Sequence, residues 1–227
     1  MNISVFGTGV VGRTIARKLN EVGHDIMIGT RNVAATMARS EPGSYGMPPL
    51  SAWLQGNPSI ALGTFAEASA YGEVAINAIN GAGAVDAIGI GGRSNLEGKI
   101  LIDLANPLDF SNGFPPSLFV CNTDSLGEQI QRAFPKTRVV KTLNIVNCNV
   151  MVDPGAVAGG DHTMLLCGDD PDARSAVSGY LKQWFGWKDV VDLGDLAAAR
   201  GMEMMLPIWI RMYGALKTAV FSFKVAR

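Results

Sequence analysis

The chain has 227 residues, of which 48% are hydrophobic and 17% charged, and its net charge is −1. This composition is typical of a compact globular protein and excludes a disordered chain. The balanced charge argues against a nucleic-acid partner and against a basic membrane-binding tail. Three scattered cysteines without a CxxC pair indicate reduced thiols, and two histidines outside any HExxH pattern predict no metal site.

No targeting or membrane segment is expected. The first five residues run directly into an apolar, strand-like segment, without the basic region and cleavage site of a signal peptide. The most apolar region, 202–225, is interrupted by Glu203, Arg211 and Lys217, and a membrane span needs about 20 mostly apolar residues. We therefore expect a cytoplasmic protein.

Short apolar runs alternate with helix-like runs along the chain. The expected strands cover 3–6, 25–28, 59–62, 74–78, 99–104, 138–143, 163–167 and 189–192. Several of these runs are continuously apolar, as strands buried on both faces of a parallel sheet are. The alternation predicts an α/β fold: a Rossmann-type, doubly wound, mostly parallel sheet with right-handed crossovers and a small C-terminal helical segment.

The segment between the first two strands has the periodicity of an amphipathic helix. Val11, Ile15, Leu19 and Val22 fall on one stripe at steps of four, four and three residues. Gly23 follows as the expected helix stop.

Three further segments depart from the simple alternation. Residues 41–58 are rich in proline and glycine and predict a surface excursion, either a lid over a bound ligand or a passive loop. Residues 105–116 predict a second loop. Residues 196–223 predict one long helix, bent at Pro207, so we divide the chain into a sheet domain at 1–193 and a C-terminal helical segment at 194–227.

A GxGxxG pattern stands between the first expected strand and the first expected helix, which is the context that its mechanism requires. The first glycine permits a tight turn, the second lets the backbone approach a pyrophosphate, and the third lets helix and strand pack closely. Backbone N–H groups and the helix dipole then hold the phosphates. The predicted phosphate-binding residues are Gly7, Thr8, Gly9, Val10, Val11 and Gly12.

The end of the second strand predicts which nicotinamide cofactor binds. A site for NAD usually carries Asp or Glu here, to accept hydrogen bonds from the ribose 2′-hydroxyl. This strand is followed instead by Thr30, Arg31 and Asn32, without an acid. Arg31 is suited to pair with a 2′-phosphate as a bidentate donor, with Thr30 and Asn32 as neutral donors. The sequence therefore predicts NADP(H), with an ordinary solvated arginine as the alternative reading of Arg31.

Two later strand ends are expected near the nicotinamide half of the cofactor, because such cofactors lie across the carboxyl ends of the strands. The candidate residues are Ala78, Ile79, Asn80, Ala105, Asn106 and Pro107. For Asn106 two readings stay open, a hydrogen bond to the cofactor or a cap on its own turn.

Together with later motifs, the chain resembles the NADP-dependent reductases of the deazaflavin coenzyme F-420. The resemblance is carried by "GTGVVG", "IGTRN", "DLANPL", "VVKTLN", "LLCGDDPDAR" and "GMEMMLPIWIRMYGAL", which span nearly the whole chain. It implies a homodimer and direct hydride exchange between NADPH and a second planar ring. It also implies 2′-phosphate contacts at Thr30 and Arg31.

The resemblance places the second ring between the strand ending "KTLN" and the C-terminal helix, and so predicts Asn144 as a substrate-binding residue. The deazaflavin reductases tend to carry His at this position, whereas membrane-bound ferric reductases with related NADPH domains carry Asn and pass electrons to a flavin. A deazaflavin and a flavin therefore both stay open as the acceptor. Met205 and Trp209, one helical turn apart, are the expected cleft-wall residues, and the remaining apolar helix positions are expected in the core and the dimer interface.

Hydride transfer between stacked rings depends mainly on placement, so we name no catalytic acid or base. His24 lies at the wrong end of its strand, His162 is read as a turn residue, and Lys141 is expected to pair locally. Two alternatives remain. One is an NADPH-dependent reductase of a small carbonyl or imine, which needs a proton donor, and the other is a non-catalytic NADP-binding sensor.

Overall fold

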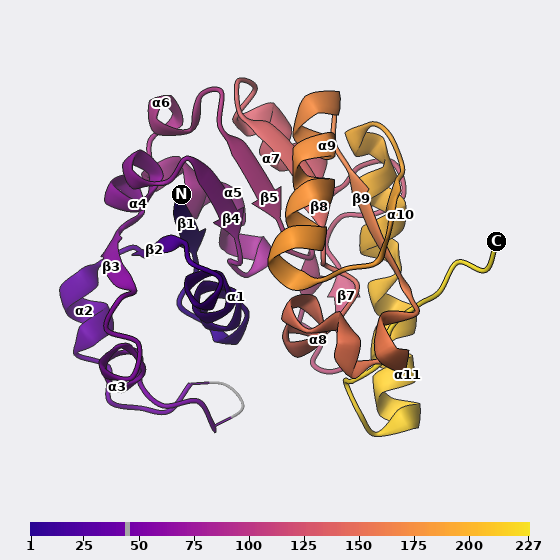
Figure 1. The fold of residues 1–227 in the computed structure, drawn as a ribbon, viewed down its shortest axis with the longest axis horizontal. Coiled ribbons are helices and arrows are strands. Elements are labelled where there is room, and N and C mark those ends of the chain that lie inside the picture. Colours follow the sequence, from indigo (N-terminus) through magenta and orange to yellow (C-terminus); the bar gives the residue numbers. More distant parts are fainter. Residues whose placement is uncertain (44–45) are drawn as a thin grey trace.

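The computed structural model describes residues 1–43 and 46–227. Within them, one eight-stranded sheet has the order β10-β9-β8-β5-β4-β1-β2-β3 (Figure 1). The strands are β1 (Asn2–Phe6), β2 (Asp25–Thr30), β3 (Ala61–Thr64), β4 (Val74–Asn77), β5 (Ile100–Asp103), β8 (Arg138–Thr142), β9 (Thr163–Cys167) and β10 (Asp189–Asp192). The pairs from β3 to β8 are parallel, β9 runs antiparallel to β8, and β10 is parallel to β9. The predicted α/β fold class is confirmed.

All eight expected strands are present, with boundary shifts at their ends. The largest shift is at β3, which begins at Ala61 and not at residue 59, because a turn precedes it in which the N–H of Ile60 donates to the carbonyl of Asn57 at 3.1 Å. All four residues of β4 and of β5 are buried. Burial on both sheet faces explains why these strands lack apolar–polar alternation.

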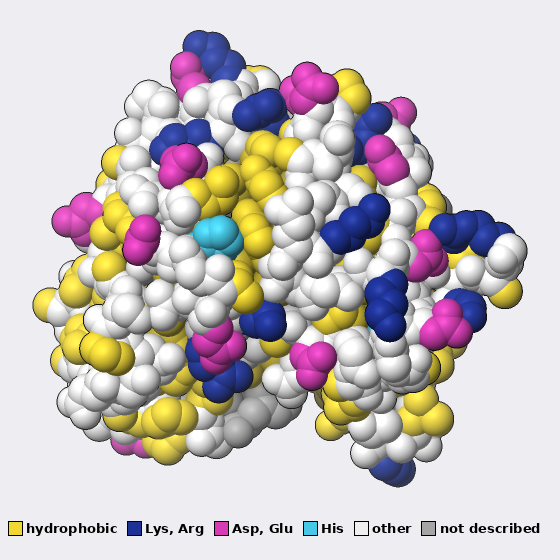
Figure 2. Space-filling view, in the orientation of Figure 1, with side chains coloured by type: hydrophobic (Ala, Val, Ile, Leu, Met, Phe, Trp, Pro, Cys, Tyr) yellow, Lys and Arg dark blue, Asp and Glu magenta, His cyan; other side chains and the backbone are white. Residues whose placement is uncertain are grey.

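Helices cover both faces of the sheet (Figure 1). One face packs against α1 (Val10–Glu21), α8 (Cys148–Val152), α9 (Pro171–Tyr180) and the π-helical turn η5 (Leu181–Phe185). The other packs against α4 (Phe65–Tyr71), α5 (Ala84–Ile90), α6 (Arg93–Leu96) and α7 (Leu126–Ala133). Short turns η2 (Gly81–Gly83), η3 (Pro154–Ala156) and η4 (Ala158–Gly160) join these elements. On the face shown in Figure 2, positive and negative side chains are interspersed.

The expected stripe of α1 is confirmed only in part. Ile15 and Leu19 are fully buried, but Val22 is 40% exposed because the helix ends at Glu21 and Val22 is its C-cap. Gly23 follows with a φ of +93°, a backbone conformation that favours glycine and stops the helix.

The excursion expected at 41–58 includes residues 44–45, which lie outside the described residues. It follows α2 (Val33–Met37) and contains the helix α3 (Leu50–Gln55), whose Leu50 and Trp53 are buried. The Arg13 guanidinium also donates to the carbonyl of Pro48 at 2.6 Å. The described part of the excursion after residue 45 is therefore attached to the sheet domain, through Pro48 and the buried side chains of α3.

The loop expected at 105–116 is more ordered than the sequence suggests. It contains β6 (Leu108–Asp109), which pairs antiparallel with β7 (Ser117–Leu118). Such two-residue strands are too short to show a periodicity in the sequence.

The expected single helix at 196–223 is wrong. The chain forms η6 (Leu196–Ala198), α10 (Ala199–Met204) and α11 (Leu206–Leu216). Pro207 lies in the first turn of α11, where its missing N–H is tolerated, and so it starts a helix instead of bending one. Lys217, with a φ of +55°, ends α11, and the carbonyl of Phe223 in the following tail accepts from the N–H of Thr163 at 2.9 Å.

Among the described residues, none of the helices has the length and apolar character to cross a membrane.

Candidate functional site

The three glycines of the first turn have different surroundings. Gly7 has a φ of +123°, and a Cβ there would lie 2.6 Å from the carbonyl oxygen of Ala78. A Cβ on Gly12 would collide with the carbonyl oxygen of Gly7, whereas a Cβ on Gly9 would meet none of the described residues within 4 Å. Gly7 and Gly12 thus permit close packing, and Gly9 leaves open space in front of α1, as the pyrophosphate mechanism requires.

The N-terminus of α1 is suited to hold an anion. Gly9 is the N-cap and offers no side-chain cap, and the first turn contains no acidic residue. The first N–H groups of a helix lack intrahelical partners and carry the positive end of the helix dipole. An anion bound before α1 would meet these groups at the turn where Gly9 is the N-cap.

Arg13 fixes this turn, and the sequence analysis did not identify it. It is buried, and its Nε donates to the carbonyl of Thr8 at 2.8 Å while its Nη1 binds the carbonyl of Pro48. Burial lowers the pKa of Arg13 below its ordinary value. Because Pro48 is 35 residues away, only the fold reveals this link between the glycine turn and the excursion.

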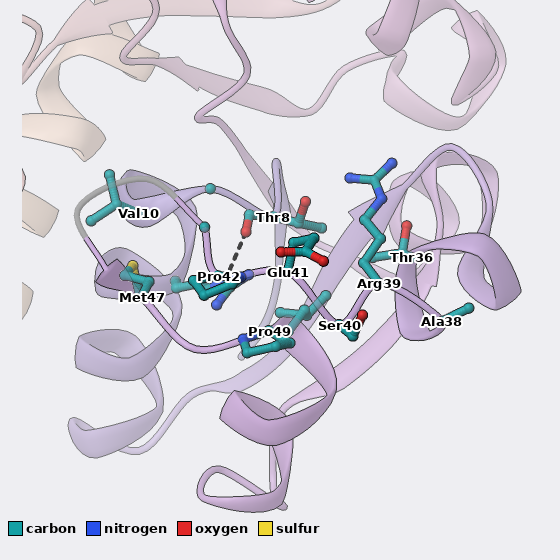
Figure 3. Close-up of a pocket in the computed structure, with 14 residues that line it drawn as sticks. Thr8, Val10, Thr36, Ala38, Arg39, Ser40, Glu41, Pro42, Met47 and Pro49 are labelled. Atoms are coloured by element: carbon teal, nitrogen blue, oxygen red, sulfur yellow. Dashed lines mark hydrogen bonds between the residues drawn. The ribbon is translucent and has the colours of Figure 1, made fainter.

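A cavity of about 540 Å³ lies between the glycine turn and the excursion (Figure 3). Its lining consists of Thr8, Gly9, Val10, Arg13, Thr36, Ala38, Arg39, Ser40, Glu41, Pro42, Gly43, Met47, Pro49 and Leu50. Arg39 and Glu41, of opposite charge, both belong to this lining, and the Arg39 guanidinium extends away from Glu41 (Figure 3). The excursion therefore forms one wall of the space beside the phosphate-binding turn.

Of the three residues at the end of β2, Thr30 and Asn32 are engaged locally, whereas Arg31 forms no ion pair with the described residues. The Thr30 hydroxyl is buried and hydrogen-bonds the Thr36 hydroxyl at 2.8 Å, and Asn32 Oδ1 caps α2 by accepting from the N–H of Ala35 at 2.8 Å. Arg31 is exposed, and its Nη2 lies 3.2 Å from the Cβ position of Gly83. The guanidinium thus reaches from the end of β2 toward the turn after β4.

Arg31 and Arg39 take part in no ion pair within residues 1–43 and 46–227. Arg39 was not predicted, because it stands two residues beyond α2, in a segment where the sequence has no motif. Two uncompensated guanidinium groups near the end of β2 favour a ligand with negative charge at this place.

The ends of β4 and β5 meet, as expected for parallel neighbours. A Cβ on Gly81 would collide with the carbonyl oxygen of Asn106, so the two turns touch. Asn80 is exposed and caps η2 by accepting from the N–H of Ala82 at 3.2 Å. The fold therefore brings the candidate residues Ala78, Ile79, Asn80, Ala105, Asn106 and Pro107 to one edge of the sheet. A second cavity, of about 730 Å³, adjoins Asn80 and includes Phe110 and Phe119.

Asn144 lies beside Asn106. It is 2% exposed, and its Nδ2 donates to Asn106 Oδ1 at 2.9 Å and to the carbonyl of Met202 at 3.2 Å. In return, Asn106 Nδ2 donates to the carbonyl of Asn144 at 2.9 Å. The two amides hold the ends of β5 and β8 together, so both side-chain polar atoms of Asn106 bond to Asn144, an arrangement different from the cap on its own turn that the sequence suggested as one reading.

Met205 and Trp209 lie on the C-terminal helical segment and are both half-buried. Met205 packs against the core cluster on the α1 face. The Trp209 ring stacks on Tyr213 and Phe221, with centroid distances of 5.9 and 5.2 Å. Trp209 is therefore part of an aromatic cluster that joins α11 to the chain's last segment.

Lys141 is fully buried in β8 and pairs locally, as the sequence analysis expected. Its Nζ lies 2.8 Å from Asp103 Oδ2 and 2.8 Å from Glu203 Oε1. Burial lowers the pKa of Lys141, but the two carboxylates outweigh it and hold that pKa above its ordinary value. Burial raises the pKa of Glu203, against the opposing effect of Lys141. Asp103 and Glu203 were missed because they are distant from Lys141 in the sequence.

The two histidines lie outside this edge of the sheet. The His24 ring packs edge-on against Trp184, and buried His162 has its Nε2 2.9 Å from the carbonyl oxygen of Pro154. In the part of the chain that the structure describes, no His, Cys, Asp and Glu cluster could hold a metal ion.

Comparisons with known proteins agree with this geometry. Residues 2–107 match the family model described as NADP oxidoreductase, coenzyme F-420-dependent. A crystal structure from Arthrobacter sp. FB24, provisionally described as an F-420-dependent NADP reductase, is 53% identical, covers 100% of both chains and has a TM-score of 0.95. No curated protein matches the chain.

More distant structures share the fold. A hypothetical protein from Sinorhizobium meliloti is 22% identical over 88% of each chain, with a TM-score of 0.62. An imine reductase from Aspergillus terreus, solved with NADPH4 and dibenz[c,e]azepine, is 18% identical over 95% of this chain and 62% of its own, with a TM-score of 0.63. At these identities the likeness concerns the architecture alone.

Proposed function

This chain belongs to the family of coenzyme F-420-dependent NADP oxidoreductases, and we propose that it transfers a hydride between NADP(H) and a deazaflavin or flavin-like acceptor. The observation that best supports this proposal is that two features of an NADP site occur together at the carboxyl ends of β1 and β2. Among the described residues, the space at Gly9 before α1 is open and Arg31, which follows a strand without an acidic end, forms no ion pair.

Each part of this edge has a role in the proposed reaction. The α1 N-terminus binds the pyrophosphate, and Arg31, with Arg39 nearby, binds the 2′-phosphate. The turns after β4 and β5 orient the nicotinamide half. When bound, the nicotinamide supplies the hydride chemistry, so the protein's contribution is to hold the donor carbon and the acceptor atom of the second ring in contact, at about 3–3.5 Å.

The structure gives no support to reduction of a small carbonyl or imine by Lys141. That reaction needs a proton donor in contact with substrate. Lys141 was the candidate, but it is 0% exposed and paired with two carboxylates. A bound deazaflavin or flavin requires no such donor from this lysine.

One absorbance experiment tests the proposal. NADPH oxidation is followed with coenzyme F-420, FMN, FAD and a ferric chelate in turn. Oxidation with F-420 alone supports the deazaflavin acceptor, and oxidation with FMN or FAD supports the flavin-like form. Tight NADPH binding without turnover on any acceptor identifies a sensor and refutes the enzymatic proposal.

We also propose that the protein is a homodimer through α11. Ile208 and Leu216 of α11 lie eight residues apart and are both 52% exposed, and Met204, the last residue of α10, lies four residues before Ile208 and is 39% exposed. Figure 2 shows hydrophobic side chains on the lower-right lobe, where Figure 1 draws α11. A second copy burying this stripe explains its apolar character.

Sedimentation velocity at micromolar concentration tests the dimer. The wild type is expected as a dimer, and Ile208→Glu as a monomer with unchanged circular dichroism. Val225→Glu is the control, because Val225 is similarly exposed but lies on the tail beyond α11. A monomeric wild type contradicts the proposal.

A further inference from the structure

We propose that Lys141, Asp103 and Glu203 form a positioning cluster that holds the turn after β5 in its cofactor-binding conformation and ties that conformation to helix α10. The inference rests on the proposed function, since it assumes that this turn contacts NADP(H). None of the three side chains needs to touch the cofactor.

The cluster is a costly arrangement if its only purpose is stability. All three side chains are at most 1% exposed, and Lys141 Nζ lies 2.8 Å from a carboxylate oxygen of each partner. Buried ion pairs can often be replaced by apolar side chains without loss of stability, because the desolvation of the charges offsets their attraction. The contacts around the cluster indicate what else it does.

One side of the cluster ends on the cofactor-facing turns. Asp103 Oδ1 accepts from Asn77 Nδ2 at 2.7 Å and from the N–H of Ala105 at 3.1 Å. Lys141 Nζ also donates to the carbonyl of Ala105. Asn77 Oδ1 in turn accepts from the N–H of Ile79 at 3.2 Å. Both backbone polar groups of Ala105 are therefore bound by the cluster.

The other side of the cluster ends on helices. Glu203, from α10, accepts from the N–H groups of Leu126 and Gly127 at 2.9 and 3.1 Å. These are the first residues of α7, where a carboxylate is favoured by the helix dipole. Glu203 thus connects α10 and α7 to the lysine that binds Ala105.

A second path joins the same elements. The carbonyl of Met202, the residue before Glu203, accepts from Asn144 Nδ2, which also donates to Asn106 Oδ1. Consecutive residues of α10 therefore reach consecutive residues of the β5 turn, 105 and 106. A displacement of α10 has two routes by which it changes the turn that faces the nicotinamide.

The net charge of the cluster shows which substitutions can change the position of the turn without unfolding the protein. The cluster contains one cation and two carboxylates, so Glu203→Gln leaves the neutral pair Lys141–Asp103 in place. Asp103→Asn leaves the neutral pair Lys141–Glu203. Neither variant leaves an isolated buried charge, which is the arrangement that destabilises most.

Arg200→Gln is the matched control. Arg200 also lies on α10, and its Nη2 binds Glu128 Oε1 of α7 at 2.6 Å, but this pair is near the surface and has no bond to residues 105–106. It loosens the α10–α7 connection without touching the cluster. The dissociation constant for NADPH is measured by fluorescence titration, and folding by circular dichroism and thermal melting.

We expect Glu203→Gln to raise the NADPH dissociation constant about tenfold, a size typical of coupling between linked sites, with Arg200→Gln unchanged. If Glu203→Gln and Arg200→Gln both lower the melting temperature and neither changes the NADPH dissociation constant, the cluster only stabilises the fold and the inference is overturned. If Glu203→Gln does not fold, Asp103→Asn decides by the same criterion. A wild type without NADPH affinity refutes the proposed function instead.

Discussion

Two cations near the carboxyl edge of the sheet lie in opposite surroundings. Arg31 is exposed and forms no ion pair within the described ranges, whereas Lys141 is fully buried between two carboxylates. An exposed cation without an ion pair can bind an anionic ligand, whereas a buried cation paired with two carboxylates has a structural role. The comparison therefore separates a binding role from a positioning role, which residue type alone does not.

The largest effect is expected from Lys141→Met. The substitution leaves two carboxylates buried without a counter-charge, which costs about 3–5 kcal/mol of unfolding free energy. Urea unfolding at neutral pH measures this loss. Lys136→Gln, which removes an exposed pair with Glu97, serves as the control and is expected to cost under about 1 kcal/mol. Equal stability of Lys141→Met and wild type would show that the cluster is not ionised as drawn.

The pH dependence of that loss follows from the pKa of Lys141. A pKa raised in the folded state stabilises the fold below the ordinary lysine value, and this contribution is lost as pH rises through the raised value. The stability difference between wild type and Lys141→Met should therefore narrow at strongly alkaline pH. Urea titrations of both proteins across the alkaline range measure it, and a difference that widens there contradicts the assignment.

Arg31→Ala tests the other cation. Hydrogen bonds to charged groups contribute about 1.5–3 kcal/mol, so NADPH affinity is expected to fall by roughly 10- to 150-fold. NADH lacks the 2′-phosphate, and its binding should not change. The melting temperature without ligand should also stay constant, because Arg31 has no ion pair to lose in the part of the chain described. An unchanged NADPH to NADH ratio refutes the assignment.

Gly9→Ala asks whether the open space before α1 belongs to a ligand. Apart from its chain neighbours, the added methyl meets none of the described residues within 4 Å, so folding should be unaffected. If the pyrophosphate lies there, NADPH affinity falls by about tenfold or more, equivalent to about 1.4 kcal/mol. Gly23→Ala is a poor control because of its positive φ, but Gly179→Ala, also with nothing near its Cβ, is suitable. Equal NADPH binding by Gly9→Ala would place the phosphates elsewhere.

The same contrast applies to what the sequence could predict: features set by neighbouring residues were predicted, and contacts between distant residues were not. The strands, the GxGxxG turn and the acid-free end of β2 are local patterns, readable within about ten residues. The bonds from Arg13 to Pro48 and from Lys141 to Glu203 join residues 35 and 62 positions apart, and their partners follow only from the topology.

The C-terminal segment shows why a local pattern can also mislead. Its apolar residues continue on both sides of Pro207 and past Lys217, which suggested a single helix. Part of that apolar surface, at Ile208 and Leu216, is 52% exposed. Hydrophobic periodicity therefore did not locate the helix ends, which the proline and the left-handed Lys217 set.

The smallest effect is expected from Glu41, which lines the same cavity as Thr8 and Arg39. Its carboxylate repels phosphate, so Glu41→Gln should tighten NADPH binding by a few fold, in line with about 0.2–1 kcal/mol for exposed charges. Glu21→Gln, at the opposite end of α1, makes the same charge change away from the cavity and should leave binding unchanged. Weaker binding by Glu41→Gln would instead mean that this carboxylate accepts hydrogen bonds from the bound nucleotide, and that the excursion contributes attraction as well as a wall.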